Sequence, residues 1–94
     1  MNAPSAISMD RREISDRYRG EIIRSGKWRI VICKDSYQWI LQRLTRSESP
    51  DGVRWEGRHY FRQRDTAIRL WRKHTGEDGA ILMALLPERF STLK

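Results

Sequence analysis

The sequence predicts a small α+β domain, in which a three-stranded antiparallel sheet is followed by one or two C-terminal helices. Two runs of alternating apolar residues flank a short turn within residues 28–44, and a third strand-like run covers 54–61. At residues 64–75 the apolar spacing changes from two residues to three or four, which is typical of a helix. A chain of 94 residues has room for one modest hydrophobic core.

The hairpin at residues 28–44 is expected to organise the rest of the domain. A two-residue turn at Asp35 and Ser36 would place Ile32 opposite Trp39. Ser36 stands where such a turn prefers glycine, so a wider turn is the alternative. Because strand side chains alternate, this register predicts one core face. Its residues are Trp28, Ile30, Ile32, Trp39 and Leu41.

The opposite face of the hairpin is mixed, with Val31, Cys33 and Ile40 in its middle. The sequence leaves open whether its own chain or a second copy covers this face. Residues 1–20 are polar and charged, with few apolar side chains to offset the entropy of ordering. They are predicted to form a mobile arm, with a short amphipathic helix as the alternative. The domain is placed at 21–90 and a tail at 91–94.

The third strand, 54–61, contains Gly57, which is predicted to mark a bulge. A bulge there would bring Trp55 and Tyr60 to the same face, which a regular strand would not do. Trp55, beside the loop that precedes this strand, is the tryptophan most expected to be exposed.

Two helical segments are expected after the sheet. The first, 64–75, begins near Gln63 or Asp65 and ends at Gly76, a residue type that commonly terminates helices. The second apolar run, 79–86, ends at Pro87 and would be capped by Asp78. Its alanine, leucine and methionine content favours a helix over a buried strand.

Several function classes find no support in the sequence. Cys33 is the only cysteine, so neither an intrachain disulfide nor a cysteine-based zinc site can form. His59 and His74 lack the spacing of a metal-binding pair, and no glycine-rich phosphate loop is present. We therefore expect a non-enzymatic protein without metal or cofactor. No apolar run is long enough for a membrane span and no signal peptide is recognisable, so a cytoplasmic location without membrane association is expected.

Positive charge is the most informative feature. The formal net charge is +7, and 15 of the 19 basic residues are arginine. Arginine favours bidentate contacts with phosphate and carboxylate groups. A phosphate-binding surface is therefore predicted in the segment 58–72, with three of its arginines clustered where the third strand meets the helix. The predicted binding residues are Arg58, Arg62, Arg64, Arg69 and Arg72.

These residues predict nucleic-acid binding, to DNA or RNA, with little sequence specificity. The alternative is a protein-interaction or inhibitor module of a mobile element that docks an acidic protein partner. Homodimerisation through the face with Val31, Cys33 and Ile40, or through a sheet edge, is a third alternative.

Residues 26–90 also resemble a known pattern. The stretches KWRIVICKD, QWILQR, RWEGRHYFRQRDTAIRLW and ALLPERF are similar to those of an uncharacterised family of small basic proteins common in alphaproteobacterial and mobile-element genomes. This chain departs from that pattern at Ser36, Phe61 and Gln63. The resemblance implies a shared fold and no particular activity.

Overall fold

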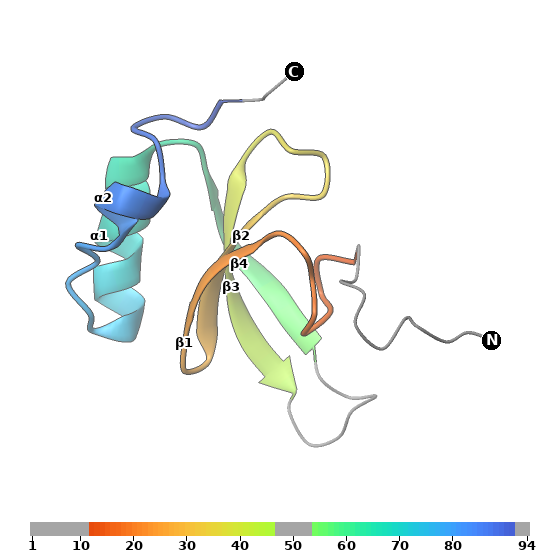
Figure 1. The fold of residues 1–94 in the computed structure, drawn as a ribbon. Helices are drawn as coiled ribbons and strands as arrows, with labels where there is room; N and C mark the ends of the chain where they lie inside the picture. The colour runs from red at the N-terminus through yellow and green to blue at the C-terminus, as the bar shows by residue number, and fades with distance from the viewer. Residues whose placement is uncertain (1–11, 47–53, 92–94) are drawn as a thin grey trace.

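One four-stranded antiparallel sheet forms the centre of the molecule, for which the computed structural model describes residues 12–46 and 54–91. The strands follow one another as a meander, and both helices lie on one side of the sheet (Figure 1). The elements are β1 (Glu21–Ser25), β2 (Trp28–Ile32), β3 (Trp39–Arg46), β4 (Arg54–Phe61), α1 (Arg64–Thr75) and α2 (Leu82–Leu85).

The α+β class is confirmed, but the predicted count of three strands is wrong because β1 adds a fourth. β1 pairs with β2 through a bulge between Glu21 and Ile23, and the two strands are joined at Gly26, whose φ is +58°. Ile22 and Ile23 both pack against the core although they are adjacent in sequence. The bulge breaks the simple alternation by which a strand is recognised.

The predicted hairpin register is confirmed, with Ile32 opposite Trp39. The turn is the wider alternative: the N–H of Cys33 donates to the carbonyl of Gln38 at 2.9 Å, which leaves residues 34–37 as a four-residue loop. Ser36 takes the positive φ of +58° that this loop requires.

β4 contains the predicted bulge. Leu41 pairs with His59 whereas Gln42 pairs with Gly57, so one additional residue of β4 lies between these pairs. Trp55 and Tyr60 consequently fall on the same face, as expected. A Cβ atom on Gly57 would lie 2.4 Å from the Tyr60 hydroxyl. The Tyr60 side chain therefore occupies the space that a side chain at residue 57 would need.

The main core lies between the sheet and α1. Ala67, Leu70 and Trp71 are buried on one side of α1 and meet the predicted hairpin face. α1 has the predicted bounds, and Gly76, with φ of +82°, donates its N–H to the Arg72 carbonyl at 3.1 Å. α2 is a helix as expected but spans only 82–85, not 79–86.

The C-terminal segment closes this core. Leu82 and Leu86 are buried, and the ring of Phe90 meets the ring of Trp39 edge-on at a centroid distance of 5.0 Å. The N–H of Phe90 donates to the Arg62 carbonyl at 2.6 Å, which fixes the chain beside the start of α1. Of the predicted tail, residues 92–94 lie outside the described residues.

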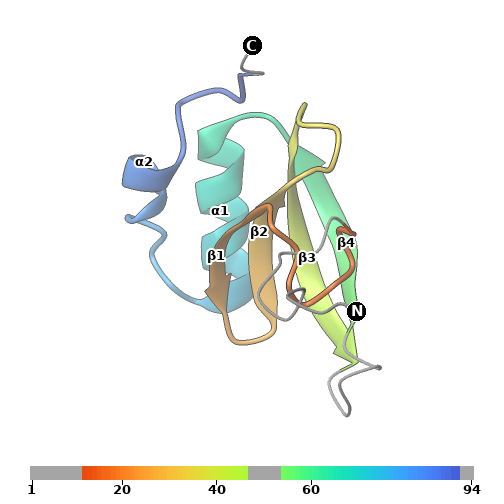
Figure 2. The ribbon, with the colours of Figure 1, turned by 45° about the vertical axis from the view of Figure 1, so that its right-hand side comes forward.

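Residues 12–20 cover the opposite face of the sheet (Figure 2). Tyr18 is 4% exposed, packs with Val31, Cys33 and Ile40, and donates its hydroxyl proton to the Ile32 carbonyl at 2.6 Å. This part of the predicted arm therefore belongs to the domain. The chain itself covers Val31, Cys33 and Ile40, and homodimerisation stays a prediction. Residues 1–11 of the arm lie outside the described residues.

A polar network holds the 12–20 segment in place. Arg29, which is fully buried, donates to the carbonyl oxygens of Glu13 and Ser15 at 2.9 and 2.8 Å. Trp55 is 1% exposed and donates its indole N–H to Asp16 at 3.0 Å, so the expectation that Trp55 is exposed is wrong. Hydrogen bonds made by a buried cation therefore hold this segment in addition to the packing of Tyr18.

Candidate nucleic-acid interface

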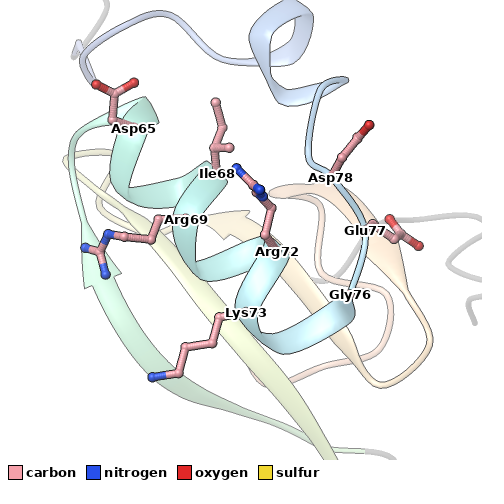
Figure 3. Close-up of a pocket in the computed structure, with 8 residues that line it drawn as sticks. All are labelled: Asp65, Ile68, Arg69, Arg72, Lys73, Gly76, Glu77 and Asp78. Carbon is pink, nitrogen blue, oxygen red and sulfur yellow. The ribbon is translucent and has the colours of Figure 1, made fainter.

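The outward side of α1 carries three of the exposed cations. Arg69, Arg72 and Lys73 are spaced three and four residues apart, so their side chains leave the helix on neighbouring positions. Figure 3 shows Arg69 and Lys73 extending to one side of α1, and Arg72 extending along α1 toward Ile68. Within the described part of the chain, none of these three cations has a hydrogen-bonded or ion-paired side-chain partner.

These cations line a shallow hollow between α1 and the chain that follows it (Figure 3). Three carboxylates also line the hollow, those of Asp65, Glu77 and Asp78, and the last two accept hydrogen bonds from neutral donors. Glu77 accepts hydrogen bonds from the Trp71 indole at 3.2 Å and from the Ser25 hydroxyl. Asp78 accepts a hydrogen bond from the N–H of Ala80 at 2.9 Å. These carboxylates support the turn after α1 and leave the cations of the hollow without an ion-pair partner.

Arg58, on the bulge of β4, extends the positive surface toward the sheet. It makes an ion pair with Glu56 at 3.0 Å, with both side chains about half exposed. Such exposed pairs typically contribute about 0.2–1 kcal/mol, so a phosphate can compete for this guanidinium. We call Arg58, Arg69, Arg72 and Lys73 the cationic face.

A stack of rings lies beside the cationic face at the C-terminal end of α1. His74 lies 4.5 Å from Trp28 and 5.3 Å from His59, measured between ring centroids. The guanidinium carbon of Arg43 lies over the Trp28 ring, 5.3 Å from the ring centroid. His74 Nε2 is buried and has no hydrogen-bond partner among the described residues.

Burial lowers the pKa of His74, and the nearby positive groups lower it further. These groups are His59, Lys73, Arg58 and Arg43. Arg43, Arg58 and Lys73 come from β3, β4 and α1, so cations from three elements act on this ring.

Of the five predicted binding residues, Arg64 has a different role. Its Nη1 donates to the Leu86 carbonyl at 3.1 Å, and its backbone N–H donates to the Glu88 carbonyl at 2.9 Å. Arg64 therefore ties the C-terminal segment to the start of α1. Arg62 is exposed but lies at the N-terminal end of α1, away from Lys73. The expected cluster of Arg58, Arg62 and Arg64 at the junction of strand and helix is not the arrangement found.

The structure thus gathers three of the five predicted residues, Arg58, Arg69 and Arg72, and adds Lys73. The sequence contained a signal for Lys73, because it lies four residues after Arg69 on a predicted helix. Arg58 could not be assigned to the same surface from sequence, because its position depends on how β4 returns beside α1.

The remaining candidate groups have structural surroundings. Cys33 is buried, and its sulfur accepts the N–H of Tyr37 at 3.3 Å. Within residues 12–46 and 54–91, no group of three or more histidine, cysteine or carboxylate side chains is arranged to hold a metal ion. No helix in that same part of the chain is long and apolar enough to cross a membrane.

Comparison with protein-family models, curated proteins and solved structures found no match to this chain. The resemblance of residues 26–90 to small basic proteins stays a prediction.

Proposed function

We propose that this protein is a non-enzymatic nucleic-acid-binding module, which contacts backbone phosphates through the cationic face with little sequence specificity. The supporting observation is the set of Arg69, Arg72 and Lys73, three neighbouring cations without ion-pair partners among the described residues. Phosphate contacts of this kind fix the position of a protein on nucleic acid but carry no base information.

The strength of binding should follow the release of counterions from the nucleic acid. Each neutralised phosphate on duplex DNA contributes about −0.9 to the slope of log K against log salt. The four side chains of the cationic face would therefore give a slope between about −3 and −4. The cations extend from the outward side of α1 and from β4, and flexible charged side chains of this kind contact backbone phosphates, which favours backbone contacts over base readout.

Fluorescence anisotropy tests the proposal with a labelled duplex of mixed sequence, and with single-stranded DNA and RNA, from about 50 to 200 mM salt. The variant Arg69→Ala/Lys73→Ala should weaken binding and reduce the magnitude of the slope by about two. The matched control is Arg19→Ala/Lys34→Ala, which removes two exposed cations that lie together elsewhere on the surface. Absence of binding at low salt, or an equal loss in the control, would count against the proposal.

The alternative of a module that docks an acidic protein is supported by a different observation. Three large apolar side chains are exposed on and beside α2: Ile81, Met83 and Leu85. Nucleic-acid backbone offers no complementary apolar surface for them, whereas a protein partner does.

A further inference from the structure

Tyr60 is an aromatic side chain that the fold leaves exposed on the face of the sheet away from α1, where it is 59% exposed. The other aromatic rings of the described strands are buried or already in contact with a neighbouring group. Trp28, for example, has the His74 ring at 4.5 Å and the guanidinium carbon of Arg43 at 5.3 Å from its own ring centroid. Within the described strands, Tyr60 therefore offers an aromatic surface that no other ring offers.

The position of the Tyr60 ring is fixed by the bulge in β4. A Cβ atom on Gly57 would lie 3.0 Å from Tyr60 Cζ and closer still to the hydroxyl oxygen, so the ring extends along the strand over the glycine. Ile40 Cγ2 lies 3.3 Å from the same point, next to the ring on the sheet. Unlike the hydroxyl of Tyr18, that of Tyr60 has no hydrogen-bond partner among the described residues. A ring supported in this way loses little conformational entropy when a ligand covers it.

Arginines flank Tyr60 along the chain. Arg58 precedes it by two residues on β4, and Arg62 follows it by two residues, directly after the strand ends. Both are exposed, and Arg62 has no ion-pair partner among the described residues. Glu56 is the one carboxylate of β4, and it makes the exposed pair with Arg58 for which a phosphate can compete. The aromatic ring thus lies between two available cations.

β4 is the last strand of the sheet, so no further strand limits access to the ring (Figure 2). The 12–20 segment occupies only the start of this edge, where the Ile14 carbonyl accepts the N–H of Trp55 at 3.0 Å. Arg58 belongs to the cationic face on the α1 side of the sheet. A nucleic-acid strand bound to that face can therefore reach Tyr60 around the edge of β4.

We propose that Tyr60 is a stacking platform for an unpaired base of single-stranded DNA or RNA, whose phosphates contact Arg58 and Arg62. The inference rests on the proposed function and adds contact with the bases. Bases inside a duplex are stacked on one another, so only an unpaired base has a free face for the ring. Every base has such a face, and the low sequence specificity is therefore retained. A ring between two cations matches a ligand that carries an anion beside each planar base, which an apolar protein segment does not.

Fluorescence anisotropy tests this proposal with labelled single-stranded DNA and RNA, a DNA duplex, and abasic strands that carry the phosphates without the bases. At least one single strand should bind the parent chain about fivefold or more tightly than its abasic counterpart. Tyr60→Ala should abolish this difference and leave binding of the duplex unchanged. It should also leave the slope of log K against log salt unchanged, because stacking releases no counterions. Tyr60→Phe keeps the ring and should bind as the parent does.

Tyr37→Ala is the matched control, because Tyr37 is a tyrosine of similar exposure, 50%, in the hairpin loop. This variant should bind every ligand as the parent chain does. The Tyr60 side chain is exposed, so the urea midpoint of Tyr60→Ala should be close to that of the parent. If it falls, Tyr60→Leu provides a second variant, which keeps an apolar side chain beside Gly57 but has no ring.

The stacking proposal is overturned if neither single strand binds better than its abasic counterpart. It is also overturned if a Tyr60 variant without the ring binds single strands as tightly as the parent, or if Tyr37→Ala weakens their binding equally. In each of these cases the proposed function still holds when Arg69→Ala/Lys73→Ala weakens binding. If no ligand binds at low salt, both proposals fail.

Discussion

The guanidinium carbon of Arg29 lies 4.4 Å from the centroid of the Trp55 ring, beneath the segment 12–20. Arg24 lies near the same ring, at 4.9 Å. Arg29 also donates to Gln42 at 2.7 Å and to Glu21 at 3.1 Å, so its charge is buried and hydrogen-bonded on several sides. A buried cation satisfied in this way specifies one arrangement of the groups around it.

Replacing Arg29 should therefore destabilise the domain strongly. Arg29→Ala removes the donors for three backbone carbonyls of the 12–20 segment. It also removes the donor to the Gln42 side chain and one of the two arginine partners of Glu21. Breaking a buried charge network typically costs about 3–5 kcal/mol, and we expect a loss in this range in urea denaturation. Arg24→Ala is the control: Arg24 is 36% exposed, and its loss should cost about 1 kcal/mol or less. An Arg29→Ala protein as stable as the parent would show that the network around Arg29 contributes nothing to the free energy of unfolding.

Asp16 should make the stability of the domain fall at acidic pH. Burial raises the pKa of the Asp16 carboxyl, whereas the hydrogen bond from Trp55 and the charge of Arg24 lower it by more, so it lies below its ordinary value. The unfolded chain then binds the proton more readily than the folded chain does. The stabilisation is present above the unfolded pKa of about 4 and is lost as pH falls through the folded value.

Urea denaturation at about pH 6 and about pH 3 measures this effect. Asp16→Asn should be less stable than the parent at the higher pH and should lose less stability on acidification. The idea fails if the parent and the Asp16→Asn variant lose equal stability between the two conditions.

Two glycines on the face that carries the 12–20 segment should respond differently to the same substitution. A Cβ atom on Gly20 would lie 2.5 Å from the buried Tyr18 ring and 2.8 Å from the Ile32 carbonyl, neither of which can move freely. At Gly57 the close atom is the Tyr60 hydroxyl, at the end of a side chain that is 59% exposed. Gly20→Ala should cost about 1–3 kcal/mol, as overpacking usually does, and Gly57→Ala should cost less.

Thermal unfolding of both variants compares these costs. Tyr60→Ala in the Gly57→Ala background should recover most of any loss, because it removes the atom that the new methyl group meets. The same addition in the Gly20→Ala background should recover nothing. A larger loss at Gly57 than at Gly20 would contradict this explanation.

Much of the fold was predictable because its signals are local. Trp28, Ile30 and Ile32 alternate in one strand as Trp39 and Leu41 do in the next, and this pattern was sufficient to set the register. β1 was missed because its apolar residues are adjacent rather than alternating. The 12–20 segment was missed because it is ordered by donors on a distant residue, Arg29, which bind backbone carbonyls that any sequence would offer.

The candidate site was predictable only in part. Arg69 and Arg72 belong to one helix face, which the spacing alone indicates. Arg64 also lies on α1 but turns toward the Leu86 carbonyl, a partner 22 residues away that no local pattern reveals. Ile81, Met83 and Leu85 are exposed, and the apolar run 79–86 alone does not show which of its residues will face the core.

The last prediction concerns His74 and the pH range from about 5.5 to 7.5. Burial and four nearby positive groups lower the pKa of His74. The folded chain therefore favours neutral His74, whereas the unfolded chain takes up a proton near pH 6.5. Stability should accordingly fall as pH drops below about 6.5 toward the folded pKa, and His74→Gln should flatten this fall. Added salt should weaken the dependence as well, because the contributions of Lys73, Arg58 and Arg43 are Coulombic.

Urea midpoints measured across that range provide the test, with Asp16→Asn as the control. The Asp16 carboxyl titrates below this range, so its replacement should shift all midpoints equally and leave their pH dependence unchanged. His59→Gln should also reduce the dependence, but by less, because it removes one of the four charges that act on His74 and leaves its burial intact. If the midpoints are constant between about pH 5.5 and 7.5, or if their fall persists in His74→Gln, the positive groups around this ring do not destabilise its protonated form.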